Sequence, residues 1–477
     1  MKMIKLALLG GAAMAVTAAA AHADDLNALK AQIETLNARV AAMEAAPAVP
    51  AGYNLIAVAE GAAASVPGLE MSAQDKMLYG NKATVISVLP TADAPAGTTI
   101  TWSGFTRAAA IYTNGELDVK DQTWNDTAGA WDTVPSDDLG SLTSTTESDD
   151  YDVKARGEIS VVGTTDTAVG EVGVKVTLRG DFDGNGNAQV SMPTAWGYWA
   201  MTPELTLGGG YSGSLGNIGY GQDAGSYMYT QAVDFNPGDT TQMRLSYASG
   251  PFSAAIALED ASYSLGDSDS EEIVKAATGD RLGVSGEVKY SGDTVSGEIS
   301  GTWRSINEDA WVAADPDVAL FSTDALWQIG AGIGFALGDM GSVSFAAAMG
   351  EGPDVSVDTS SGLVSTIVPW NGSWWGASAL ASFNMTDEIH AELGVGYKDR
   401  NYDDVKAGTE KLAGSSEQLV VGGGLYYTPV DQLTIGVEAS WSDTSAVATF
   451  TDRGENVSRL TADGNTTTVD LVSVWRF

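Results

Sequence analysis

The chain has 477 residues, with 62 acidic and 24 basic side chains, a formal net charge of −38 at pH 7, and no cysteine. So acidic a composition disfavours nucleic acid as a partner, because the phosphate backbone is bound by clustered Lys and Arg. Of the two histidines one lies within the first 23 residues, so a Ser-His-Asp triad or a multi-histidine metal site would have to be built around His390.

Residues 1–23 have the pattern of a secretory signal peptide. Two lysines begin it, an apolar run follows over residues 6–20, and Ala21-His22-Ala23 forms a small-residue cleavage site. The alternative is an uncleaved anchor helix, but the apolar run is short against the roughly 20 residues of a membrane span. Cleavage before Asp24 leaves a formal charge of −40. No later stretch approaches about 18 continuous apolar residues, so a membrane span of the remaining chain must be a closed β-barrel.

Residues 24–46 predict a short α-helical coiled coil. Apolar side chains recur alternately three and four residues apart, as at the a and d positions of a heptad repeat. These core residues are Leu26, Leu29, Ile33, Leu36, Val40 and Met43. The alternative is one amphipathic helix lying on the barrel or on a membrane, because three heptads are few for an isolated coil. Oligomerisation elsewhere in the chain would raise the local helix concentration and stabilise the coil.

Residues 47–99 have no recognisable chemistry. They hold an Ala- and Pro-rich stretch, two candidate short strands at 53–58 and 84–89, and a second Pro-rich stretch. We expect a linker or a small periplasmic module, with a plug that enters a barrel as the alternative.

From residue 100 to the C-terminus, apolar residues alternate with polar or small ones in segments of about ten positions, as in transmembrane β-strands. The alternation assigns Val153, Val284 and Ile435 to the lipid face. Sixteen such strands are predicted, at residues 100–113, 151–163, 168–180, 188–200, 205–212, 242–249, 252–259, 281–291, 294–306, 325–338, 342–351, 373–386, 389–401, 417–429, 433–443 and 466–477.

The connections alternate between short turns, such as Thr202-Pro203-Glu204 and Asp431-Gln432, and mostly longer, acidic, Gly- and Ser-rich loops. Short periplasmic turns opposite longer external loops are typical of outer-membrane barrels. A soluble sandwich or propeller needs no such asymmetry and would aggregate with so many apolar faces. Aromatic residues at strand ends suit the membrane interfaces: Trp102, Tyr112, Trp303, Tyr397, Tyr427, Trp441 and Trp475. The sequence therefore predicts an all-β membrane protein, a 16-stranded antiparallel transmembrane β-barrel over residues 100–477.

Residues 100–107 (ITWSGFTR), residues 205–211 (LTLGGGY) and the terminal Phe477 resemble general-diffusion porins, particularly the alphaproteobacterial kind. The resemblance covers residues 100–477 and implies a homotrimer whose third loop, at about residues 213–241, folds inward as a constriction. It implies Asp223, Asp234 and Asp239 as the acids of that loop, although the Pro-Glu-Phe-Gly-Gly signature of enterobacterial porins is absent. Trp475 and Phe477 resemble the C-terminal signal that the outer-membrane assembly machinery recognises.

Barrel alternation places nine basic residues on the lumen face, because charge on the lipid face costs about 2–4 kcal/mol at the midplane. They are Arg107, Lys154, Arg156, Lys175, Arg179, Arg244, Arg281, Lys289 and Arg304. Facing an acidic loop, they would set a transverse field that orients polar solutes. The alternative is that each is solvated and paired with a neighbouring carboxylate, such as that of Glu158, Glu171, Glu287 or Glu298. Acidic loops at the mouth lead us to expect weak cation selectivity.

These features predict a water-filled outer-membrane channel for passive diffusion of small hydrophilic solutes, without catalytic residues or a cofactor. The alternative is a tether whose periplasmic coiled coil binds the cell wall or a partner, with the barrel as its anchor. Residues 114–150 hold ten acids and one lysine, so a calcium site or a divalent bridge to lipopolysaccharide stays open. The EF-hand-like start at Asp181 has Met192 where the loop requires Glu, which disfavours calcium there. An enzyme of the phospholipase type is disfavoured because His390 has no recognisable serine motif.

Overall fold

The computed structural model describes a chain that is almost entirely β-sheet, and Ile56–Leu89 with Ala96–Phe477 form one compact unit. The described residues are 56–62, 64–69, 71, 73–80, 83–88, 97–125, 127–136, 142–182, 188–221, 233, 235–260, 282–305, 318–319, 325–352, 372–407, 410–452 and 455–477. The predicted signal peptide (1–23) and coiled coil (24–46) lie outside them. Within these ranges no helix is long and apolar enough to cross a membrane.

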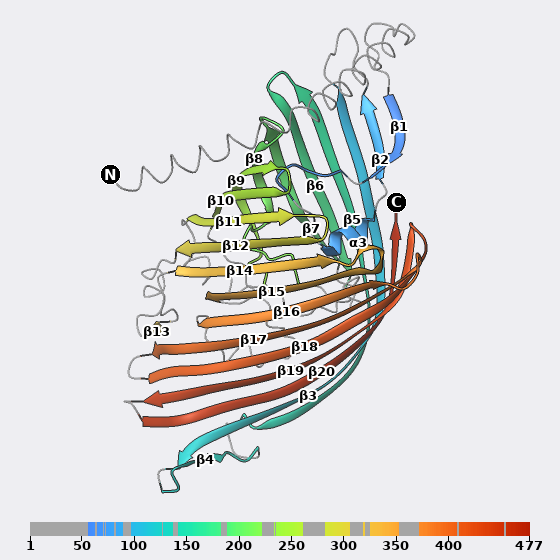
Figure 1. The fold of residues 1–477 in the computed structure, drawn as a ribbon. Coiled ribbons are helices and arrows are strands. Elements are labelled where there is room, and N and C mark those ends of the chain that lie inside the picture. Colours follow the sequence, from blue (N-terminus) through green and yellow to red (C-terminus); the bar gives the residue numbers. More distant parts are fainter. Residues whose placement is uncertain are drawn as a thin grey trace, which may run out of the picture. The chain divides into compact units, whose positions relative to one another are not determined.

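In the described part of the chain, sixteen strands form a closed antiparallel barrel (Figure 1). Each pairs with the next, and β3 also pairs with β20, from Phe105↔Arg476 to Thr123↔Ser458, which closes the sheet. The prediction of a 16-stranded barrel is therefore confirmed. The barrel strands are β3 (Thr98–Asn125), β5 (Ser144–Thr167), β6 (Gly170–Phe182), β7 (Ala188–Ala200), β8 (Leu205–Gly213), β9 (Asp239–Ser249), β10 (Phe252–Asp260), β11 (Leu282–Ser291), β12 (Val295–Ser305), β14 (Ala325–Ala336), β15 (Gly341–Glu351), β16 (Ser373–Asn384), β17 (Ile389–Ala407), β18 (Glu410–Val430), β19 (Leu433–Asp452) and β20 (Glu455–Arg476).

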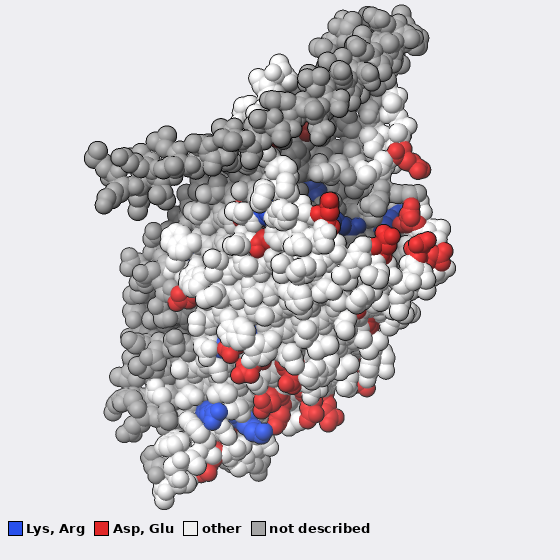
Figure 2. Space-filling view, viewed as in Figure 1, with Lys and Arg blue, Asp and Glu red and all other residues white. Residues whose placement is uncertain are grey.

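Side chains of the wall alternate between an apolar outer face and a largely polar inner face, because successive residues of a strand point to opposite sides of the sheet. On β9, Met243 is 61% exposed outside and Arg244 is 5% exposed inside. Val153, Val284 and Ile435 are exposed, as predicted. Figure 2 shows a largely uncharged outer surface across the middle of this face, with charged side chains gathered mainly toward its margins. Such a surface suits contact with lipid.

The two rims of the barrel differ in their connections. One rim carries short turns, such as residues 250–251 between β9 and β10 and residues 431–432 between β18 and β19. The other carries the longer connections, except between β17 and β18 and between β19 and β20, where only two residues separate the strands. At this rim β3, β5 and β17–β20 run far beyond the strand ends that the sequence predicted (Figure 1). Residues 114–119 and 144–149, expected as loop, continue the β3–β5 ladder. Backbone hydrogen bonds pair the strands in these extensions, and a small buried apolar cluster of Val119, Ala448, Leu460 and Ala462 packs there.

A hairpin precedes the barrel and joins its sheet at the short-turn rim. β1 (Ile56–Gly61) pairs with β2 (Ala83–Val88), near the two strands expected at 53–58 and 84–89. β2 pairs with the start of β3, beyond the point where β20 ends, so it continues the line of β20 along β3. Three small elements also occur among the described residues: β4 (Ala130–Thr133), β13 (Val318–Ala319) and η2 (Gly338–Met340).

Between β1 and β2 the chain leaves the wall and enters the barrel. The described part of this stretch, residues 64–69, 71 and 73–80, is named the lumen segment. It contains α3 (Ala73–Tyr79), which ends at Gly80. Gly80 adopts φ 62°, and its N–H donates to Lys76 O at 3.1 Å, so glycine supplies the left-handed conformation that ends the helix. Leu78 and Tyr79 pack inside the barrel against Phe105, Val472 and Val474.

Candidate functional site

Glu259 of β10 and Arg304 of β12 form a buried ion pair on the inner wall, with Arg304 Nη2 3.3 Å from Glu259 Oε2. The Glu259 carboxylate also accepts hydrogen bonds from Ser214 Oγ, at 2.8 Å, and from Ser285 Oγ. Six residues further along β11 from the position level with this pair, Lys289 Nζ lies 2.9 Å from Glu287 and 3.5 Å from Glu298. Charge on this wall is therefore held in short-range pairs.

A second charged cluster lies on β5 and β6. Arg179 Nε donates to Glu158 Oε2 at 2.6 Å, and Tyr79 of the lumen segment donates its hydroxyl hydrogen to Glu158 Oε1. Arg156 pairs with Asp181. Burial, together with the charge of Glu158, raises the pKa of the Tyr79 phenol above its ordinary value, so the phenol stays a hydrogen-bond donor.

The third loop joins β8 to β9, and its described residues 214–221, 233 and 235–238 lie against the inside of the barrel. Gly216 O accepts a hydrogen bond from Gln328 Nε2 of β14 at 2.9 Å. Gly219 N donates to Glu298 of β12, and Gly221 N donates to Ser344 Oγ of β15 at 3.0 Å. The expected bounds of 213–241 were too wide, because β8 includes Gly213 and β9 begins at Asp239.

Glycines of β14 make room for this loop. A Cβ added at Gly332 would lie 2.6 Å from Tyr220 Cβ, and one added at Gly334 would lie 2.8 Å from the Tyr220 ring. Both distances are too short for non-bonded carbon atoms. The glycine run of residues 330–334 therefore permits the close packing that the loop requires.

The lumen segment is attached to two parts of the wall. At the seam between β20 and β3, Arg476 donates to Met77 O and Leu78 O, each at 2.9 Å. The ring of Tyr79 meets that of Phe105 edge-on, with centroids 5.2 Å apart. On the β9 side, Arg244 Nη1 donates to Gly68 O at 2.9 Å.

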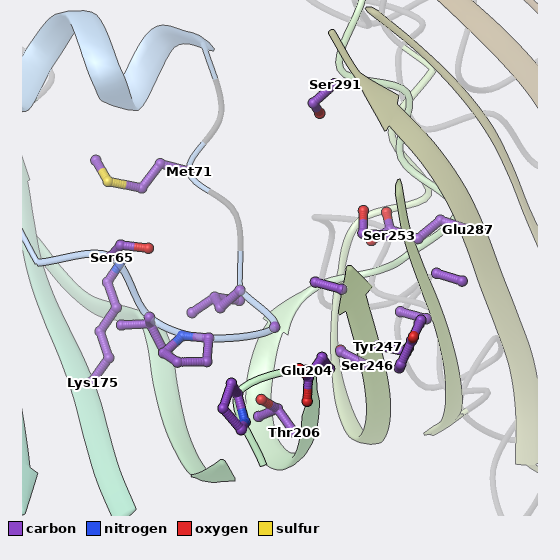
Figure 3. A pocket seen from close by; sticks show the side chains of 18 of the residues that line it. Ser65, Met71, Lys175, Glu204, Thr206, Ser246, Tyr247, Ser253, Glu287 and Ser291 are labelled. Carbon is purple, nitrogen blue, oxygen red and sulfur yellow. The ribbon is translucent and has the colours of Figure 1, made fainter. Parts of the chain in front are cut away.

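Two adjoining cavities remain between the lumen segment, the third loop and the wall. The mouth cavity, of about 510 Å³, reaches the short-turn rim at Pro203 and Ser291 (Figure 3). The deep cavity, of about 340 Å³, extends to the third loop at Asn217. Both linings include Leu69, Met71, Lys175 and Glu287. The charged residues that line the deep cavity are Asp75, Glu158, Lys175, Arg179, Asp239, Arg244, Glu287 and Lys289.

Polar cavities inside a barrel with an apolar outer face are the arrangement expected of a channel. A protein-family model described as Porin subfamily matches residues 104–469. The chain belongs to this porin family. As a member, the porin is an outer-membrane channel for diffusion and not an enzyme. No curated protein matches the porin's sequence.

Solved structures of other outer-membrane proteins are similar to the porin. An anion-selective porin from Comamonas acidovorans matches with TM-score 0.45 and 12% identity over 80% of this chain and 100% of that one. The outer-membrane channel DcaP of Acinetobacter baumannii matches with TM-score 0.43 and 13% identity over 82% and 99%. OmpT of Vibrio cholerae matches with TM-score 0.43 and 12% identity over 80% and 98%.

Eight of the nine basic residues predicted for the lumen lie on inward positions of the porin's described strands, and Arg281 lies outside the described residues. Several are paired with carboxylates, which supports the alternative of local pairing: Lys154 with Asp152, Arg156 with Asp181, Arg179 with Glu158, Lys289 with Glu287 and Glu298, and Arg304 with Glu259. Of the predicted loop acids, Asp223 and Asp234 lie outside the described residues, and Asp239 is the first residue of β9. Trp475 and Phe477 are exposed, 47% and 55%.

The sequence interpretation missed several charged residues of the porin's inner wall. Lys398 and Arg400 of β17 are buried, as are Arg476, Glu259, Glu438 and Asp470. The alternation that identified Arg107 also marks Lys398 and Arg400, which alternate with the outward Val395 and Tyr397. No pattern marks Asp75 and Tyr79, because a single short helix shows no period.

Proposed function

We propose that the porin passes small hydrophilic solutes and ions by passive diffusion through a water-filled lumen, with a weak preference for cations. The observation that carries the proposal is the lining of the two adjoining cavities, which combines charges of both signs with the hydroxyls of Ser65, Ser246, Ser253 and Ser291. Such groups replace part of the hydration shell of a polar solute, whereas an apolar solute gains nothing from them.

The cation preference rests on the rim of long connections. In the β3–β5 extension Glu116, Glu147, Asp149 and Asp150 are exposed. Lys120 Nζ lies 2.8 Å from Asp118 Oδ2, so the carboxylate offsets the positive charge of this lysine. An acidic rim raises the local concentration of cations at the entrance.

Reversal potentials of the purified protein in planar bilayers under a KCl gradient test this proposal. We expect a small cation preference that declines as ionic strength rises, because salt screens exposed charge. Replacing Glu147, Asp149 and Asp150 by their amides should weaken it further. A clear anion preference of the unmodified protein would contradict the proposed selectivity, and the absence of conductance would contradict the channel itself.

We also propose a homotrimer, on the resemblance to general-diffusion porins. Single-channel records should then show three equal closing steps. A monomeric mass in detergent, together with single steps, would contradict the trimer.

A second candidate function is a tether, which the heptad pattern of residues 24–46 favours. In this proposal the coiled coil binds the cell wall or a periplasmic partner. Deletion of residues 24–46 should leave conductance intact and weaken attachment of the outer membrane to the wall. Unchanged attachment would contradict the tether.

A further inference from the structure

The lumen segment is held as a rigid part of the barrel interior. Leu78 and Tyr79 are 2% and 3% exposed and pack on the β3–β20 seam. Arg476 holds the backbone of α3 at the same seam through Met77 O and Leu78 O. Release of α3 from the seam would expose the buried apolar surface of Leu78 and Tyr79. It would also remove two carbonyl acceptors from the Arg476 guanidinium.

The other end of the segment is attached to a different part of the wall. Val66 packs against Val162, Trp196 and Tyr198, with Leu69 beside it. Arg244 reaches Gly68 O from β9. The segment therefore bridges the lumen between the β3–β20 seam and strands β5–β9, and a solute must pass beside it.

The two cavities show on which side a solute can pass. Figure 3 places Ser65 and Met71 of the segment across the mouth cavity from Ser253, Glu287 and Ser291 of the wall. The deep cavity continues past Met71 and Asp75 to the third loop. The segment thus packs on the seam with Leu78 and Tyr79, and its other residues line both cavities.

The open side brings one carboxylate of the segment to the basic wall. Asp75 lines the deep cavity together with Lys175 and Arg179 of β6, and its charge acts on both. The Glu158 carboxylate, on the same wall, already accepts hydrogen bonds from Arg179 and Tyr79. Asp75 therefore adds a further negative charge from the segment, beside that of Glu158, at a point where the nearby wall carries the positive charges of Lys175 and Arg179.

We propose that the lumen segment is a fixed second constriction on the short-turn side of the third loop, and that Asp75 is a residue that determines ion preference there. This inference rests on the proposed channel function. Solutes pass between the segment and strands β6–β11, and Asp75 offsets the anion attraction of Lys175 and Arg179. The segment stays in place during conduction.

Charge substitutions at Asp75 test the selectivity. In bilayers under a KCl gradient, Asp75→Asn should lower the cation-to-anion permeability ratio by about twofold, since a unit charge several ångströms away in water acts at this level. Asp75→Lys should lower it further. The matched control is Asp387→Asn, the same change on an exposed turn of the same rim, which should leave the ratio unchanged. Equal ratios for the unmodified protein and both Asp75 variants would overturn the assignment.

A cross-link tests whether the segment stays fixed. A Cβ at Gly68 would lie 3.3 Å from Ser246 Cβ, just under the roughly 3.5–4.5 Å of a disulfide. Gly68 adopts φ 73°, so a cysteine there is strained, and formation of the bridge is checked by the loss of free thiol. The chain has no cysteine of its own. Gly68→Cys with Ser246→Cys should form a bridge, and oxidised and reduced protein should conduct equally. A higher conductance after reduction would show a segment that leaves the lumen, and would overturn the fixed constriction.

A third experiment distinguishes failure of this inference from failure of the proposed channel function. If the unmodified porin does not conduct, the proposed function fails. If it conducts and Asp75→Cys is not modified by a small cationic thiosulfonate reagent added in the bath, Asp75 does not line the path and the inference alone fails. Rapid modification with a change in permeability ratio supports it.

Discussion

Tyr79 and Glu158 are joined by a hydrogen bond inside the barrel, although they lie 79 residues apart in the chain. Glu158, on β5, also accepts a hydrogen bond from Arg179 of β6, so one carboxylate connects the lumen segment to both strands. The contact makes a stretch that precedes the barrel in sequence part of the passage through it. Loss of this hydrogen bond should therefore loosen the lumen segment and leave the barrel strands unchanged.

Replacing Tyr79 by Phe removes the donor and leaves Glu158 paired with Arg179. We expect the docked segment to lose about 2 kcal/mol, the range of a hydrogen bond to a charged group. Amide hydrogen exchange over residues 73–80 should accelerate at least about tenfold, since each 1.4 kcal/mol is a factor of ten, while the barrel strands keep their protection. The control is Tyr427→Phe, a residue exposed on the outer face. Unchanged exchange in α3 would show that its apolar contacts alone hold it.

The Glu259–Arg304 pair predicts a larger effect on global stability. Glu259→Gln leaves the buried guanidinium without its counter-charge, which costs about 3 kcal/mol or more. The double variant Glu259→Gln with Arg304→Met should cost less than Glu259→Gln alone, because no unpaired charge remains buried. Free energies of unfolding from urea titration of the protein refolded in vesicles measure this. Asp152→Asn is the matched control, because its pair with Lys154 is about a third exposed and should contribute less than about 1 kcal/mol.

The glycines beneath the third loop predict a change in pore size. Valine at Gly332 cannot coexist with Tyr220, whose Cβ would lie 2.6 Å from the new Cβ. The loop must move away from β14, and single-channel conductance should change while the barrel stays folded. Gly209→Val is the control, since a Cβ there meets its neighbours at an ordinary 3.5 Å or more. The same conductance in Gly332→Val and unmodified protein would show that the loop does not limit flow.

Period-two alternation predicted the barrel strands well, because lipid outside and water inside impose opposite demands on alternate residues. Arg244 between Met243 and Leu245 is such a case. The same signal was weak beyond the apolar band, where acidic and small polar residues prevail, so residues 114–119 and 144–149 were assigned to a loop although they pair. Strand count depends on the apolar band, whereas strand length beyond it depends on backbone hydrogen bonds and on a small buried cluster that includes Val119 and Leu460, a weaker mark on the sequence.

Interior contacts were less predictable. The basic lumen residues followed from alternation, but their partners depend on register: Arg304 meets Glu259 across β11, which no spacing along the chain reveals. Asp75 and Tyr79 lay in a stretch whose candidate structures included a plug, without a signal to choose it. Their positions follow from Arg476 and Phe105, at the far ends of the barrel sequence, which only closure of the sheet brings together.

Adjacent positions on β10 test the two faces of the wall directly. Ile256 is 57% exposed on the outer face, and Ala255 faces inward and lines the mouth cavity. Ile256→Arg places a charge against hydrocarbon near the middle of the strand and should cost about 2–4 kcal/mol in the free energy of folding into vesicles. Ala255→Arg should fold nearly normally, because its register partner is Glu287, and should reduce conductance by narrowing the mouth. If both substitutions destabilise the protein equally, or if Ile256→Arg is harmless, this face of β10 does not contact lipid.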